Sequence, residues 1–323
     1  MDFTPSVYEH CAALIGRSPW AVSRDAGLLF DAQARAYRRY RHAPVVVGVD
    51  IYNLEAEAYG AVVDQPRGNG IPAITRHPCA DLDDVLRLTP FDPATDGRIA
   101  MMIEVGRRLR DAFDDADVRI PVSGPFSIAT NLMGFEALLC AVATEPPHAR
   151  TALSRLAAGQ ERFCRAVHAA GLDIAFFESA AAPPLLSPGQ FDEVELPALR
   201  EAMARAAAVV GHPVPCVIGG DTTPILDSIL TTGTRYVICP AETDQRAFLA
   251  ILRERPDVMV RVNMRPQIVA GGTWEQIRAE VDRIRSLVGD RQAVCLGTGA
   301  LPYETPPDHV LKIKAYVERK SRR

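Results

Sequence analysis

The sequence predicts an α/β protein, folded as a single (β/α)8 TIM barrel with an N-terminal helical extension and spanning residues 1–323 as one domain. Two observations lead to this prediction. Short apolar segments rich in β-branched residues alternate with longer amphipathic segments, at a spacing of roughly 25–45 residues, as in repeated βαβ units. The apolar segments also carry little charge before their last residues, which suits parallel strands covered on both faces.

Taken in order, residues 1–43 read as helices, with a long amphipathic one from about 26 to 40. The first expected strand is 44–51, and residues 61–98 are irregular and rich in Gly, Pro and Asp. Six further strands, each followed by a helix, are expected at 118–124, 174–179, 214–220, 236–240, 258–263 and 293–299. Since a barrel needs eight strands, the eighth is expected within the first 100 residues. A doubly wound open sheet is the alternative, but no GxGxxG follows the first strand.

Composition excludes several classes of protein. Charged residues make up 24% of the chain and the net charge is −4, so nothing indicates binding to nucleic acid. No apolar segment approaches the ~20 residues that a membrane span needs, and the first residues lack a signal-peptide layout. The seven cysteines are scattered without a CxxC motif, which favours reduced thiols in the cytoplasm.

Polar side chains gather where the expected strands end, and in a barrel this edge carries the active site. We expect three carboxylates to be catalytic, namely Asp50, Glu178 and Asp221. The residues expected to bind substrate are Arg24, Asn53, Asn131, Ser179, Thr222, Asn263, Arg265 and Thr298. Asp50 ends a strand of valines and Glu178 follows two phenylalanines, where burial of a carboxylate without purpose is costly. Helix capping is the alternative for Asp221 and Thr222.

Metal and histidine chemistry find little support. The seven histidines fall in expected helices or loops, and none ends a strand. Three cysteines, Cys216, Cys239 and Cys295, lie inside expected strands, where they are expected to pack in the core. No metal ligands are therefore expected.

Five segments resemble the uroporphyrinogen decarboxylase superfamily: SGPFSIATNLM (123–133), AFFESAAAPPLLSPGQFDEVELPALR (175–200), GGDTTPILDSI (219–229), RVNMRP (261–266) and LGTGALPYETPPDHV (296–310). The resemblance runs from about Ser18 to the C-terminus. It implies a (β/α)8 barrel, usually dimeric, with its site at the carboxyl ends of the strands.

True decarboxylases of this family resemble the chain at Arg24, at Asp50, which would grip pyrrole N–H groups, and at Ser179. They differ at positions that contact substrate. Their tyrosine falls on Asn131, their second N-terminal arginine on Leu28 and their histidine on Thr298. A substrate with eight carboxylates also needs cations, and the strand ends carry few.

Other relatives are corrinoid-linked methyltransferases and epoxyalkane–coenzyme M transferases. Those acting on coenzyme M hold zinc with a His-x-Cys pair and a third cysteine. The zinc lowers the pKa of the substrate thiol and so makes it a nucleophile. On this chain the three positions hold Val217, Gly219 and Thr298, so no zinc is expected.

A zinc-free subset, which moves a methyl group between a corrinoid protein and tetrahydrofolate, resembles the chain better. A carboxylate accepts the two adjacent N–H donors of a pterin edge in bidentate fashion. We expect Asp50 or Asp221 to bind the pterin, while Arg24 or Arg265 meets the glutamate tail. A separate corrinoid protein is expected to dock over the barrel mouth. The alternatives are a decarboxylase or lyase acting on a tetrapyrrole or small acid, and a non-catalytic protein that binds a tetrapyrrole or corrinoid.

Overall fold

Eight parallel strands form one curved sheet in the computed structural model, which describes residues 1–321. In sheet order they are β1 (Asp2–Ser6), β10 (Val294–Ala300), β9 (Met259–Asn263), β8 (Tyr236–Cys239), β7 (Cys216–Val217), β6 (Asp173–Phe177), β5 (Val118–Ser123) and β2 (Val45–Val46). The first and second strands of the barrel, β1 and β2, stand at the two ends of this order. The sheet forms a nearly closed (β/α)8 barrel, so the predicted fold class is confirmed.

The eighth strand is β1, at the start of the chain. It lies within the first 100 residues, as expected, but the prediction that residues 1–43 are helical is wrong at this point. The helical extension follows the first strand instead of preceding the barrel, as α1 (His10–Ala13), α2 (Pro19–Arg24) and α3 (Ala26–Tyr40). A proline is tolerated in β1 because this strand pairs in the ladder with β10 alone, and the register shifts between Thr4 and Ser6, at Pro5.

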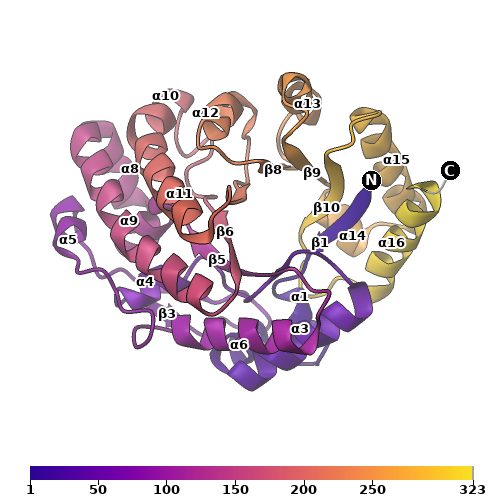
Figure 1. Ribbon diagram of the computed structural model, residues 1–323, viewed down its shortest axis with the longest axis horizontal. Helices are drawn as coiled ribbons and strands as arrows, with labels where there is room; N and C mark the ends of the chain where they lie inside the picture. The colour runs from indigo at the N-terminus through magenta and orange to yellow at the C-terminus, as the bar shows by residue number, and fades with distance from the viewer. Residues whose placement is uncertain (322–323) are drawn as a thin grey trace.

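Helices surround the strands on all sides in Figure 1, with α3 and α6 (Ile99–Ala112) at the bottom and α9 (Pro146–Ala169) and α11 (Leu196–Val210) at the left. At the top and right lie α12 (Leu226–Leu230), α13 (Gln245–Ile251), α15 (Trp274–Val288) and α16 (Pro307–Ser321). Local sequence sets their ends. Thr273 and Gln276 form a capping box at the start of α15, and α11 ends at Gly211, which is left-handed with φ 82°.

Shorter elements fill the connections. They are α4 (Leu54–Ala58), α5 (Leu82–Arg87), α7 (Pro125–Met133), α8 (Phe135–Thr144), α10 (Pro188–Gln190), a π-helical turn (Phe191–Glu195), two 3₁₀ turns (Thr223–Ile225 and Leu252–Glu254) and α14 (Pro266–Gly271). The segment 61–98 contains a two-stranded antiparallel hairpin, β3 (Val62–Asp64) with β4 (Ala73–Arg76), followed by α5. This segment was expected to be irregular, and its hairpin reaches the carboxyl ends of the barrel strands.

Two expected strands are much shorter than their apolar segments. The ladder of 44–51 ends at Val46 and that of 214–220 ends at Val217. Beyond each point the backbone turns at a glycine with positive φ, Gly48 at 123° and Gly220 at 84°. The chain after these strands therefore forms loops, which are free to line a cavity.

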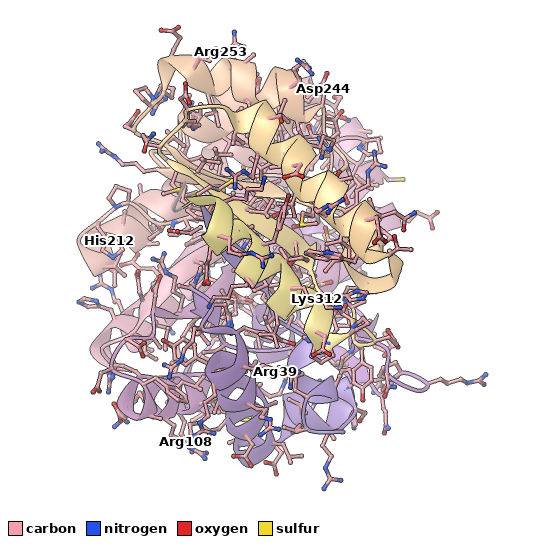
Figure 2. All side chains as sticks on the ribbon, turned by 90° about the vertical axis from the view of Figure 1, so that its right-hand side faces the viewer. Arg39, Arg108, His212, Asp244, Arg253 and Lys312 are labelled. Carbon is pink, nitrogen blue, oxygen red and sulfur yellow. The ribbon has the colours of Figure 1, made fainter. Side chains whose placement is uncertain are left out.

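The outside of the ring is polar. Figure 2 shows the side on which α15 and α16 cover the sheet, with Arg39, Asp244, Arg253 and Lys312 around the periphery, all exposed. No single helix within residues 1–321 is long and apolar enough to cross a membrane, although α7 and α8 meet that criterion as a pair bent by 116°.

Candidate functional site

A cavity of about 700 Å³ opens at the carboxyl ends of the barrel strands. Its walls are largely apolar, formed by Ile51, Ile71, Ile74, Phe135, Phe177, Val217 and Ile238. At the rim, Ile71 and Phe135 are 48% and 49% exposed, which is unusual for side chains of this size. The cavity has the size and character of a site for a small organic molecule.

Five of the residues predicted to form the site line this cavity: Asp50, Asn53, Asn131, Ser179 and Asn263. The other six do not line it, namely Arg24, Glu178, Asp221, Thr222, Arg265 and Thr298. The two groups differ in their surroundings, and the hydrogen bonds of each residue explain its position.

The carboxylate of Asp50 accepts hydrogen bonds from a largely buried arginine. Both oxygens of Asp50 accept hydrogen bonds from Arg98, at 3.0 and 2.7 Å, and Oδ2 also accepts from Asn53 Nδ2 at 3.1 Å. Arg98 Nε in turn lies 2.7 Å from Glu57 Oε2, and Glu57 forms a second ion pair with Arg24. Asp50 is therefore engaged within the protein, and Arg24 supports this network from behind the cavity wall.

Amide and hydroxyl groups form the wall beside Asp50. Asn131 Nδ2 donates to the backbone carbonyl of Tyr52 at 2.7 Å, and the backbone carbonyl of Asn131 accepts from His77 Nδ1 at 2.8 Å. The hydroxyl of Tyr52 lies 2.5 Å from Ser179 Oγ, which also accepts from the backbone N–H of Gly219 at 3.3 Å. These hydrogen bonds join five residues of the cavity wall and hold them in place.

Glu178 binds the start of a helix instead of facing the cavity. Its oxygens accept from the backbone N–H groups of Phe126 and Ser127 and from Ser127 Oγ, so the carboxyl group caps α7. A Cβ on Gly124 would lie 1.9 Å from Glu178 Oε2, which explains the glycine there. Burial raises the pKa of Glu178 to about 7, and it raises the pKa of the neighbouring Glu195 as well.

Asp221, Thr222 and Arg265 lie beyond the cavity. Asp221 is exposed and accepts from Thr243 Oγ1 at 2.7 Å, while the buried hydroxyl of Thr222 has no partner among the described residues. Neither side chain caps the helical turn that follows, so the capping alternative does not describe them. Arg265 is exposed and lines a separate surface hollow with Asp244.

The positions that correspond to zinc ligands in zinc-using relatives carry side chains that cannot coordinate the metal in that way. Val217 and Gly219 line the cavity, and Thr298 is fully buried. The hydroxyl of Thr298 accepts a hydrogen bond from the backbone N–H of Ser6 and donates one to the carbonyl of Gly299. Within residues 1–321, no group of three or more His, Cys, Asp or Glu is placed to hold a metal ion.

A further carboxyl group in the cavity wall lies just after the strand that the sequence prediction missed. Glu9 follows β1, lines the cavity and is only 7% exposed. Burial, and to a smaller extent the negative charge of Glu304, raises the pKa of Glu9 to about 7. Glu9 is thus a carboxyl group that can gain or lose a proton near neutral pH.

Sequence reasoning also missed Arg98 and Arg261. Arg98 follows an irregular segment without a pattern, and nothing in the sequence pointed to it. Arg261 could have been noticed, since it is a charged residue inside an apolar strand. Glu9 could have been found from the alternation of Phe3, Pro5 and Val7, all buried in β1 or just after it.

Comparison with known proteins matches residues 3–319 to the family described as uroporphyrinogen decarboxylase. No curated protein is similar enough to count as a match. Among solved structures, the fold is similar to a methyltransferase from Methanosarcina mazei, with a TM-score of 0.81 and 18% identity over 99% of this chain and 93% of that one. It is also similar to a protein described as a vitamin-B12-independent methionine synthase from Listeria monocytogenes, with a TM-score of 0.55 and 12% identity over 91% and 85% of the two chains.

Proposed function

The chain belongs to the uroporphyrinogen decarboxylase family, and from this premise we propose that it is a zinc-independent methyltransferase, which moves a methyl group between a corrinoid protein and tetrahydrofolate. The observation that carries the proposal is the position of Glu9, a buried carboxyl group in the wall of a largely apolar cavity. The likeness of the fold to a methyltransferase from Methanosarcina mazei agrees with it.

The cavity suits a flat heteroaromatic ring. Branched and aromatic side chains such as Ile51, Ile238 and Phe177 offer apolar surfaces for the faces of the ring. Polar groups for its edge come from Asn131 and Asn263, and the Oδ1 of Asn263 is buried without a donor among the described residues. An N–H of the pterin would satisfy that oxygen.

Glu9 would manage the proton on the pterin. When a methyl group leaves N5 of methyltetrahydrofolate, the nitrogen takes up a proton, and when a methyl group arrives, N5 loses one. Because the pKa of Glu9 is raised to about 7, it can supply or accept that proton near neutral pH. Asp50, which accepts two hydrogen bonds from Arg98, would act as a fixed wall of the site and not as the acid or base.

A corrinoid bound to a partner protein would donate or accept the methyl group. Ile71 and Phe135 form an exposed apolar rim, from the β3–β4 hairpin and the start of α8, around the cavity opening. Exposed apolar side chains at the mouth of a site favour contact with a partner. Such contact would exclude water from the cavity.

Titration with tetrahydrofolate, followed by pterin fluorescence, tests binding first, and absence of binding at millimolar concentration would refute the proposal. Formation of methyltetrahydrofolate from methylcobalamin then tests the transfer. Glu9→Gln should lower the rate roughly 10²–10⁴-fold while tetrahydrofolate binding stays within a few-fold.

The matched control is Glu304→Gln. The negative charge of Glu304 raises the pKa of Glu9, so its removal should shift the pH dependence of the transfer to lower pH without abolishing activity. An unchanged rate in Glu9→Gln would exclude Glu9 as the acid or base.

A carboxy-lyase acting on a small acid is the second candidate, and one observation favours it. The cation of Arg261 borders the same cavity as Glu9, so a carboxylate and a proton donor could meet there. A tetrapyrrole is disfavoured, because Asp50, expected to grip pyrrole N–H groups, is already bound by Arg98. Release of CO₂ from a bound acid, with no methyl transfer, would support the lyase.

A further inference from the structure

Arg261 is a buried cation without a counter-ion. It is 7% exposed, its side chain lies inside the barrel from β9, and among residues 1–321 it makes no hydrogen bond or ion pair. Its Nε is buried with no acceptor. Arg98 shows the usual arrangement for comparison. Its side chain is 10% exposed, and its guanidinium contacts two carboxylates and a backbone carbonyl.

The surroundings of Arg261 do not neutralise it. The groups that act on its charge are three phenols and a thiol, of Tyr8, Tyr52, Tyr236 and Cys295. Burial raises the pKa of each of them, so all four stay protonated at neutral pH. An unpaired charge in such a place is strongly unfavourable, because its hydration is lost without compensation. The fold gains nothing from this cost unless a ligand supplies the negative charge.

The barrel is also shaped around this side chain. A Cβ on Gly297 of the neighbouring strand β10 would lie 2.7 and 2.8 Å from Arg261 Cγ and Cδ, and 2.2 Å from Asn263 Oδ1. A glycine inside a strand is unfavourable by itself and marks a close approach. Gly297 therefore leaves room for two inward-facing polar side chains of β9, both with an unpaired polar atom.

Arg261 is reached from the site already described. It lines the 700 Å³ cavity at the barrel mouth, together with Tyr8, Phe177 and Val217. The same four residues line a smaller cavity of about 340 Å³ at the opposite end of the barrel. They thus form a layer between the two cavities, and this layer is the floor that a ligand entering from the mouth would meet.

We propose that Arg261 binds a carboxylate of the substrate inside the barrel. One guanidinium matches one planar, singly charged carboxylate, which it binds through two parallel hydrogen bonds. Phosphate or another dianion would need further cations, and among the described residues no other arginine or lysine lines the cavity at the barrel mouth. The inference concerns the ligand and does not depend on methyl transfer.

Calorimetric titration of the whole protein tests the inference. The probes are glutarate, benzoate and 4-aminobenzoylglutamate, with neutral benzamide and inorganic phosphate for comparison. In Arg261→Met we expect the carboxylate that binds best to the wild type to bind at least about 30-fold more weakly. The matched control, Arg253→Met, removes an exposed arginine from the connection between β8 and β9 and should change nothing.

Thermal unfolding without ligand separates binding from a structural role. Because Arg261→Met removes an uncompensated buried charge, the variant should unfold at a temperature equal to or above that of the wild type. A lower unfolding temperature together with unchanged carboxylate affinity would overturn the inference. So would binding of phosphate in place of every carboxylate, or binding of no carboxylate at millimolar concentration.

Discussion

Replacement of Arg98 by methionine should destabilise the protein strongly, because Arg98 is the partner of a carboxylate that is almost completely buried. The side chain of Asp50 is 2% exposed, and both of its oxygens accept from Arg98. Once the guanidinium is removed, Asp50 retains Asn53 Nδ2 and a distant Arg24 Nη2 at 3.8 Å. Breaking a buried pair on one side costs about 3–5 kcal/mol.

This cost corresponds to a measurable shift in the unfolding temperature. For 323 residues, the entropy of unfolding is about 0.7 kcal/mol/K, so the midpoint should fall by roughly 4–7 °C. Arg107→Met, which changes an exposed residue of the same helix, is the control and should stay within about 0.5 kcal/mol.

A double-mutant cycle with Asp50→Asn isolates the pair. Since the double variant no longer buries an unpaired charge at Asp50, its loss should be smaller than the sum of the single losses by about 1–3 kcal/mol. Urea unfolding of the four proteins gives the values. Additivity within about 0.5 kcal/mol, or a single loss below about 1 kcal/mol, would refute the account of Asp50 as a buried partner of Arg98.

Two other predictions concern buried acids and thiols. Burial raises the pKa of Glu178 to about 7 and that of Glu195 well above its ordinary value. The folded chain therefore holds more protons than the unfolded chain from about pH 4.5 upward. Its free energy of unfolding should consequently fall as the pH rises toward 7 and beyond. In urea unfolding, Glu195→Gln should reduce this fall while the exposed Glu193→Gln keeps it, and equal slopes in all three proteins would contradict the prediction. Of the seven free cysteines only Cys140 is exposed, so a thiol reagent should modify one group rapidly and all seven after denaturation, and Cys140→Ser should abolish the rapid phase.

Polar side chains of the site could be predicted from the sequence where they occupy a recognisable place in the pattern of strands and helices. Alternating strands and helices predicted the barrel. Two polar residues at the ends of apolar segments, Asp50 and Asn263, line the cavity, and so does Asn131 in α7, the helix that follows β5. The strand β1 was missed because it contains Pro5, which argues against a strand, and Glu9 was missed with it. Its side chain is brought to the site by pairing with the last strand, about 290 residues away in the chain.

The sequence by itself determined the barrel, the family resemblance and the edge of the sheet at which the site lies, because hydrophobic periodicity and strand-end residues are local properties of the chain. Only the tertiary structure decided which polar groups are available. Asp50 is bound by Arg98 and Glu178 by the start of α7, while Glu9 and Arg261 border the cavity without an ion-pair partner among the described residues. Whether a charge is paired depends on groups distant in sequence, and its desolvation depends on what covers it, so neither property can be read from the neighbours of a residue along the chain.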